Sequence, residues 1–208
     1  MRGYIFLAVI FYLKISSISA QSVVDFLNSY NKHIDPFERL DTTQVLTLKM
    51  VTKIRYSASA TINEINRTRV CKYYANGDRN CFNTDGSTDH LEKYPIPLEY
   101  DGNAIKYQLE FIPIDEPDLF SFLLITDSIT VIEKVVGKSE THVFTFDNKT
   151  MNLLQRSTVS RDTGYVSFTN YESYQIVCGI LIRKKISFNN QFSTATIEFD
   201  DVEFSSDH

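Results

Sequence analysis

The sequence LTLKMVTKIRY, residues Leu46–Tyr56, decides the fold of this chain. Every second residue from Leu46 onward is apolar or aromatic, except Thr52, and three of the residues between them carry positive charge. Side chains alternate between the two faces of a β-strand, so the pattern predicts a strand with one dry face and one solvated face. Typical strands have about five or six residues, and a strand as long as this one suits a barrel.

The chain after this strand contains further short apolar or alternating segments, separated by turn residues such as Asn76-Gly77. We expect about eight to ten strands in all, a pattern typical of an all-β barrel or sandwich. The further strands are expected at 68–75, 104–112, 119–125, 128–136, 142–146, 153–159, 164–171, 174–183 and 194–199. Residues 21–40 are the one helix-like segment, and the acidic tail 200–208 is expected to be loose.

Residues 1–20 have the pattern of a secretory signal peptide: Arg2 precedes an apolar run, and small residues end at Ala20. The run is too short to cross a bilayer, which needs about 20 apolar residues. No later stretch is long enough for a membrane span, so we expect a secreted, extracellular protein with residues 21–208 as a single domain. Sequons at Asn66 and Asn148 predict N-glycosylation on this route.

The composition argues against several classes of protein. With 43% hydrophobic and 13% aromatic residues, the chain is not disordered. A net charge of −5 argues against nucleic-acid binding, which needs clustered Lys and Arg. The four histidines show no metal-ligand spacing, and no phosphate loop or nucleophile motif occurs. We therefore expect a protein without metal, cofactor or enzymatic activity.

The three cysteines, Cys71, Cys81 and Cys178, predict one disulfide and one leftover thiol in a secreted protein. A Cys71–Cys81 bond would close a short loop. A Cys71–Cys178 bond would tie an early strand to a late one and stabilise more in the chain-entropy model. The residues alone leave both pairings open.

Four side chains are candidate ligand contacts inside a barrel. Glu133 falls on the apolar face of the predicted strand 128–136. A carboxylate on an inward face costs free energy unless it is paired, so Glu133 either neutralises a cationic ligand or lies near water at a strand end. Tyr56, Tyr107 and Phe111 also fall on predicted inward faces, where aromatic side chains contact a ligand or form core.

Four segments together resemble the tick salivary lipocalins, the histamine-binding family. Asp35–Leu40 is similar to the family's helix before the first strand, and Leu46–Tyr56 stands in the place of its first barrel strand. Thr68–Tyr73 matches the family's second strand with its cysteine, and Phe168–Leu181 is similar to a later Phe-x-Asp-Tyr-x-x-Cys segment. The chain departs from the family in having no tryptophan and in ending without the family's C-terminal helix.

The cysteines depart from the family pattern as well. Cys71 and Cys178 match cysteines of the family, but the family's usual partners for them are missing. The resemblance therefore implies that these two pair with each other or not at all, and we take the Cys71–Cys178 disulfide as the prediction.

The resemblance implies a lipocalin-like antiparallel barrel of about eight strands with a short N-terminal helix and room for one small ligand. It implies a monomeric scavenger in tick saliva that sequesters histamine or serotonin, with Glu133 on the ammonium group. One alternative is a carrier of a leukotriene or fatty acid with a basic mouth from Lys49, Lys53 or Arg55. Others are a binder of a host protein through loops such as Asn76–Asp89, or a secreted enzyme.

Overall fold

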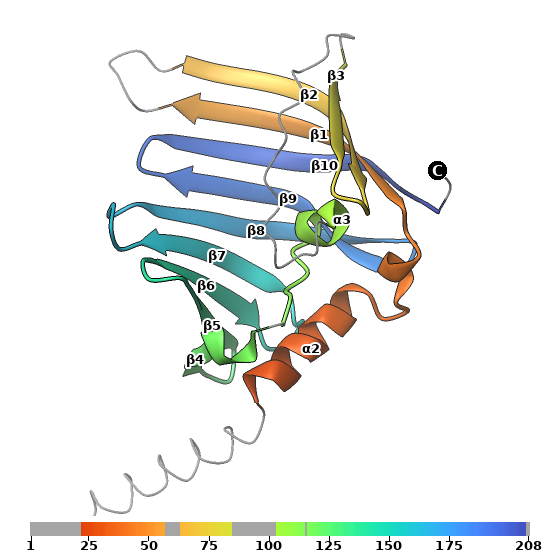
Figure 1. The fold of residues 1–208 in the computed structure, drawn as a ribbon. Helices are drawn as coiled ribbons and strands as arrows, with labels where there is room; N and C mark the ends of the chain where they lie inside the picture. Colours follow the sequence, from red (N-terminus) through yellow and green to blue (C-terminus); the bar gives the residue numbers. More distant parts are fainter. Residues whose placement is uncertain (1–21, 57–62, 85–102, 115, 207–208) are drawn as a thin grey trace, which may run out of the picture.

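A computed structural model describes residues 22–56, 63–84, 103–114 and 116–206 of the protein (Figure 1). Ten strands form one antiparallel sheet in the spatial order β3-β2-β1-β10-β9-β8-β7-β6-β5-β4. β3 and β4 are its two edges and do not pair with each other, so the sheet curls but stays open. The predicted all-β class is confirmed, whereas the closed eight-stranded barrel is wrong. The predicted signal peptide lies outside the described residues.

Consecutive strands pair as antiparallel neighbours, except that β3 and β4 lie at opposite edges of the sheet and the first strand pairs with the last. In chain order they are β1 Val45–Tyr56, β2 Asn63–Tyr74, β3 Arg79–Asn83, β4 Phe120–Ile125, β5 Ile129–Val136, β6 Glu140–Asp147, β7 Leu153–Ser160, β8 Val166–Val177, β9 Ile180–Asn190 and β10 Ser193–Ser205. Helices α2 (Val23–Ile34) and α3 (Ala104–Gln108) lie on the same face of the sheet, which we call the inward face. No helix in the described segments is long and apolar enough to cross a membrane.

β1 confirms the alternation from which the fold was predicted. Leu46 and Leu48 are fully buried on the inward face, whereas Lys49 and Arg55 point to the outward face and pair there with Asp201 and Glu64. The strand pairs along its length with β2 on one side and β10 on the other. A one-residue slip would exchange the two faces, so burial of the leucines fixes the register.

Helix α2 begins at a capping box. The Ser22 hydroxyl accepts a hydrogen bond from the Asp25 amide, and the Asp25 carboxylate accepts one from the Ser22 amide. The helix ends at Asp35, whose carboxylate accepts hydrogen bonds from the amides of Arg39 and Leu40. The predicted helical segment 21–40 is thus one helix followed by a short 3-10 turn, which leads the chain into β1.

The predicted strand at 104–112 is wrong. Asn103 accepts hydrogen bonds from the amides of Ile105 and Lys106, and this cap starts α3 instead. The alternation of apolar residues had predicted a strand, but a five-residue helix buries Ala104, Ile105 and then Leu109 against the sheet.

Two predictions for the last third of the chain need correction. The predicted strand 174–183 contains a hairpin turn, because Cys178 and Gly179 both have positive φ, +51° and +79°, and join β8 to β9. The acidic tail predicted to be loose is strand as far as Ser205, which pairs with Val45 of β1. The register shifts between Thr47 and Lys49, where Asp201 on the opposite strand has a positive φ of +46°.

The core is filled by aromatic rings where α2 crosses the strands β4 to β6. Phe26 of α2 packs edge-to-face on Phe122 and Phe146, with ring centroids 6.2 and 5.1 Å apart. Tyr30 contacts Phe146 in the same way, at 4.9 Å, and Phe146 is fully buried. Interlocking aromatic side chains therefore form the core in this half of the inward face.

Candidate ligand-binding site

The other half of the inward face is hollow. A cavity of about 390 Å³ lies between α3 and the strands β1, β2, β3, β9 and β10. Its lining residues are Met50, Thr52, Ile54, Arg69, Tyr73, Arg79, Ala104, Tyr107, Gln108, Glu110, Arg183, Ile186, Ile197 and Phe199. Cavities of roughly 300–1,000 Å³ are the usual size of small-molecule sites.

The floor of the cavity is a block of apolar side chains on neighbouring strands. Met50 of β1 lies opposite Phe199 of β10. Two residues further along β1, Thr52 lies opposite Ile197 of β10. On its other side, Ile197 lies opposite Ile186 of β9. Opposed residues of antiparallel strands present their side chains to the same face, so these rows form one continuous surface.

The β2–β3 side of the cavity is cationic. Arg69 lies opposite Met50, and Arg79 lies opposite Tyr73. The Arg79 guanidinium sits 5.3 Å from the centroid of the Tyr73 ring, and its Nε donates to Cys81 Sγ at 3.2 Å. The β2–β3 hairpin thus places two positive side chains at one end of an apolar floor.

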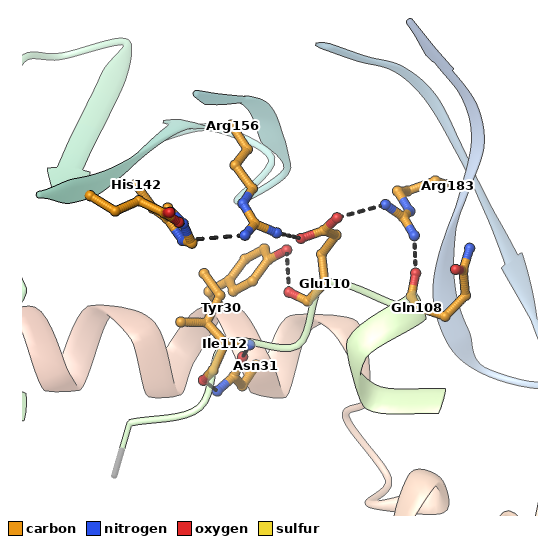
Figure 2. Close-up of polar contacts among 9 residues, drawn as sticks. Tyr30, Asn31, Gln108, Glu110, Ile112, His142, Arg156 and Arg183 are labelled. Atoms are coloured by element: carbon orange, nitrogen blue, oxygen red, sulfur yellow. Dashed lines mark hydrogen bonds and ion pairs between the residues drawn. The ribbon is translucent and has the colours of Figure 1, made fainter. Parts of the chain in front are cut away.

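Glu110 closes the α3 side of the cavity and is held by two arginines (Figure 2). Arg183 of β9 and Arg156 of β7 approach its two carboxylate oxygens from opposite sides, at 2.9 and 3.1 Å. The carboxylate is largely buried, as are both guanidinium groups. Arg183 also donates to the backbone carbonyl of Gln108 at the end of α3.

Helix α2 positions the segment that carries Glu110. Tyr30 donates its hydroxyl to the Glu110 carbonyl at 3.3 Å. The Asn31 side chain donates to the Ile112 carbonyl at 2.7 Å and accepts from the Ile112 amide at 3.0 Å (Figure 2). The same helix that fills one half of the inward face therefore fixes the boundary of the hollow half.

The charge state of this cluster follows from its ion pairs. Burial acts to raise the pKa of Glu110, but Arg156 and Arg183, with the Tyr171 hydroxyl, outweigh it and hold the pKa below the usual value. Burial acts to lower the pKa of Arg183. Nearby groups, with Glu110 the strongest of them, outweigh burial and raise this pKa above its usual value. The Glu110 carboxylate and the Arg183 guanidinium are therefore both charged at neutral pH.

Both arginines of the cluster are also fixed by neighbouring rings. Arg183 lies 5.6 Å from the Tyr171 ring and 5.5 Å from the Phe199 ring. Arg156 lies over Phe144 and contacts His142 Nδ1 at 3.2 Å (Figure 2). These cation–π contacts hold the guanidinium groups in place on the sheet.

Among the candidate ligand contacts predicted from the sequence, the structure brings only Tyr107 to the cavity. Tyr56 lies at the end of β1 and is 40% exposed, and Phe111 packs beside the core under Lys106. The inward position predicted for Glu133 is wrong. It lies on the outward face of β5 and accepts a hydrogen bond from the Ser121 hydroxyl at 2.8 Å.

The predicted Cys71–Cys178 disulfide is also wrong. Cys71 and Cys81 are directly opposed in the β2–β3 hairpin and form the disulfide, and Cys178 is an exposed free thiol. The sequons stay predictions. Asn66 is exposed within β2. Asn148 lies in the β6–β7 turn, and its side chain donates to the Thr126 carbonyl at 2.7 Å.

Sequence reasoning missed the charged residues of the site. The predicted strand 104–112, with Tyr107 and Phe111 facing inward, implied a solvated Glu110, and Arg69 and Arg79 were not among the candidate residues. The Asn103 cap was the signal for a helix before Glu110. No group of three or more His, Cys, Asp or Glu side chains in the described segments could hold a metal ion.

No family model and no curated protein matches the sequence of this chain. Solved structures match its fold across most of the chain. A LolA superfamily protein from Nitrosomonas europaea has a TM-score of 0.57 at 9% identity, with 89% of this chain and 94% of that chain covered. A putative outer membrane lipoprotein-sorting protein domain from Vibrio parahaemolyticus has a TM-score of 0.54 at 12% identity, with 86% and 91% covered.

A DUF1329 family protein from Desulfovibrio piger is similar as well, with a TM-score of 0.51 at 11% identity and 86% and 93% of the two chains covered. None of these three is a tick lipocalin, and the resemblance to that family stays a prediction. At such low identities the likeness concerns the fold alone. The chain has an open, curled antiparallel sheet of the kind found in LolA-type proteins.

Proposed function

We propose that this protein binds one small, mainly apolar ligand in the cavity beside α3 and acts as a carrier without catalysis. The observation that carries the proposal is the hollow half of the inward face. Apolar side chains from β1, β9 and β10 line it, and no side chain of α2 fills it. Removing the apolar surface of a ligand from water at such a floor is favourable by about 25 cal/mol per Å².

The comparisons support a carrier of an apolar ligand by analogy. One similar structure is described as a lipoprotein-sorting domain and another as a LolA superfamily protein. The signal-peptide pattern at residues 1–20 supports a function outside the cytoplasm. We therefore propose an extracytoplasmic carrier.

A biogenic amine finds less support as the ligand. An ammonium group inside the cavity needs a carboxylate, and Glu110 is the carboxylate among the described lining residues. Arg156 and Arg183 already engage both of its oxygens. An amine would have to displace one of these two buried ion pairs.

The test is titration of the protein with N-phenylnaphthylamine, a neutral apolar dye that fluoresces when shielded from water. Thr52 lines the cavity, and Thr194 of the neighbouring strand is exposed on the outward face. Thr52→Phe and Thr194→Phe are therefore the same substitution on opposite faces. We expect Thr52→Phe to weaken dye binding at least tenfold and Thr194→Phe to leave it unchanged.

Equal binding by both variants would place the dye elsewhere and contradict the proposed site. Absence of saturable binding by the unmodified protein would contradict the proposed function. Histamine and serotonin serve as competitors in the same assay. We expect neither to displace the dye at concentrations where dodecanol does so.

A further inference from the structure

Thr52 is the polar side chain in the floor of the cavity. It follows Met50 and precedes Ile54 among the β1 residues that line the cavity. Ile197 of β10 lies opposite it. In the sequence, Thr52 interrupts the apolar alternation of Leu46–Tyr56. A hydroxyl at such a position costs free energy when a ligand covers it, unless the ligand supplies a hydrogen bond.

Most of the other polar side chains in the lining are already engaged within the protein. Glu110 and Arg183 form an ion pair at 2.9 Å. The other lining residues with interaction partners in the chain are Arg69, Tyr73, Arg79 and Tyr107. A charged group on a ligand would therefore lose its hydration and would have to compete with contacts that the protein already makes.

Two polar side chains of the lining remain, those of Thr52 and Gln108. Neither has a hydrogen-bond partner among the residues that the structure describes. Figure 2 shows that Gln108 accepts a hydrogen bond from Arg183 through its backbone carbonyl, and no contact is drawn to its carboxamide. A hydroxyl and a carboxamide each donate and accept hydrogen bonds without carrying charge. The polar groups that the lining offers to a ligand are therefore neutral.

The contacts of Arg183 set Gln108 near the part of the floor that holds Thr52. The Arg183 guanidinium donates to the Gln108 carbonyl and lies 5.5 Å from the centroid of the Phe199 ring. Phe199 lies opposite Met50, and Thr52 follows two residues later on the same face of β1. A ligand on this floor thus meets Thr52 on the sheet and Gln108 on the α3 side.

We propose that the ligand is an uncharged amphiphile, with an apolar body and a hydroxyl group. Its apolar body lies on the floor formed by Met50, Ile186 and Ile197, and its hydroxyl binds Thr52 and Gln108. A hydroxyl both donates and accepts, so it complements both side chains without the desolvation cost of a charge. This inference rests on the proposed function, because it names the chemical class of the ligand for the same cavity.

Four ligands with the same dodecyl chain differ only in their end group. Dodecanol, chlorododecane, dodecanoate and dodecylamine are each used to displace N-phenylnaphthylamine at neutral pH, below their solubility limits and micelle concentrations. We expect dodecanol to bind at least about fivefold more tightly than dodecanoate or dodecylamine, because both charged ends lose hydration in the cavity. Chlorododecane lacks a hydrogen-bond donor and is the apolar reference.

The variants locate the hydroxyl contact. Thr52→Val and Gln108→Leu should each weaken dodecanol by about three- to tenfold, the usual contribution of one neutral hydrogen bond, and leave chlorododecane unchanged. Thr52→Ser keeps the hydroxyl and should retain most of the affinity for dodecanol. Thr194→Val is the matched control, because Thr194 is exposed on the outward face of β10.

The failure of this inference can be told from the failure of the proposed function. Binding of dodecanoate or dodecylamine at least as tight as that of dodecanol, with the dye displaced, would overturn the uncharged ligand and leave a carrier. Dodecanol affinity that survives both Thr52→Val and Gln108→Leu, or a loss that chlorododecane shares equally, would overturn the role of the two side chains. No displacement by any of the four ligands would overturn the proposed function itself.

Discussion

The two halves of the inward face are built from the same kind of strand but are filled differently. Under α2, the ring of Phe26 packs edge-to-face on those of Phe122 and Phe146, and Phe146 is fully buried. Beside α3, Met50 and Ile197 are only partly buried and line a cavity of about 390 Å³. The covering helix makes the difference, since α2 has twelve residues and α3 has five.

The comparison shows how one open sheet combines stability with space for a ligand. The packed half supplies the burial that keeps the chain folded, and the hollow half leaves apolar surface for a guest. Glu110 and its two arginines stand at the boundary and join α3 to β7 and β9. If this division is right, substitutions in the two halves should affect different properties.

The largest expected effect comes from emptying the packed half. Phe146→Ala removes a fully buried ring and should lower the free energy of unfolding by about 3–5 kcal/mol. Ile197→Ala in the hollow half should cost less than about 2 kcal/mol, because its side chain is partly exposed and borders an existing cavity. Urea denaturation of both variants measures the difference, and equal losses would show that the two halves do not differ in packing.

The boundary should be nearly as sensitive as the packed half. Glu110→Gln leaves Arg156 and Arg183 buried without their shared anion and should cost about 3 kcal/mol. The same change at Glu198, whose side chain is 54% exposed beside Lys185, should cost less than about 0.5 kcal/mol. A small loss for Glu110→Gln in urea denaturation would mean that the ion pairs do not hold the boundary together.

The stability due to Glu110 should depend on pH in one direction. Its folded-state pKa is lowered, so its contribution is present above the unfolded-state pKa of about 4.3 and is lost as the pH falls through the folded-state pKa. The gap in stability between the unmodified protein and Glu110→Gln should therefore narrow below about pH 4. A gap that stays constant between pH 7 and pH 3 would contradict the ionised, arginine-paired carboxylate.

The hollow half was partly visible in the sequence. The alternation in Leu46–Tyr56 correctly predicted β1 and its inward face, on which Met50, Thr52 and Ile54 line the cavity. The same rule failed for 104–112, because a short capped helix can also carry apolar residues at alternate positions. A strand in this place would put Glu110 on a solvated face, so its buried ion pairs with Arg156 and Arg183 were not predicted.

Other errors arose where alternation does not identify the buried face. β5 has apolar residues on both faces, and its buried residues are Thr130, Ile132 and Lys134 rather than those that share a face with Glu133. The disulfide was recoverable in principle. The turn at Asn76-Gly77 was predicted, and the hairpin that it closes sets Cys71 opposite Cys81. The missing step was to recognise residues 79–83 as the returning strand.

The measurement that tests the central claim most directly compares a single tryptophan in the cavity lining with a single tryptophan on the surface. The chain contains no tryptophan, so Tyr107→Trp in the cavity lining and Phe37→Trp, 68% exposed beside the β8–β9 turn, each give one fluorescent reporter. Bromododecanol quenches tryptophan on contact. We predict saturable quenching for Tyr107→Trp and none for Phe37→Trp; equal quenching of both, or none of Tyr107→Trp, would contradict a ligand site in the hollow half.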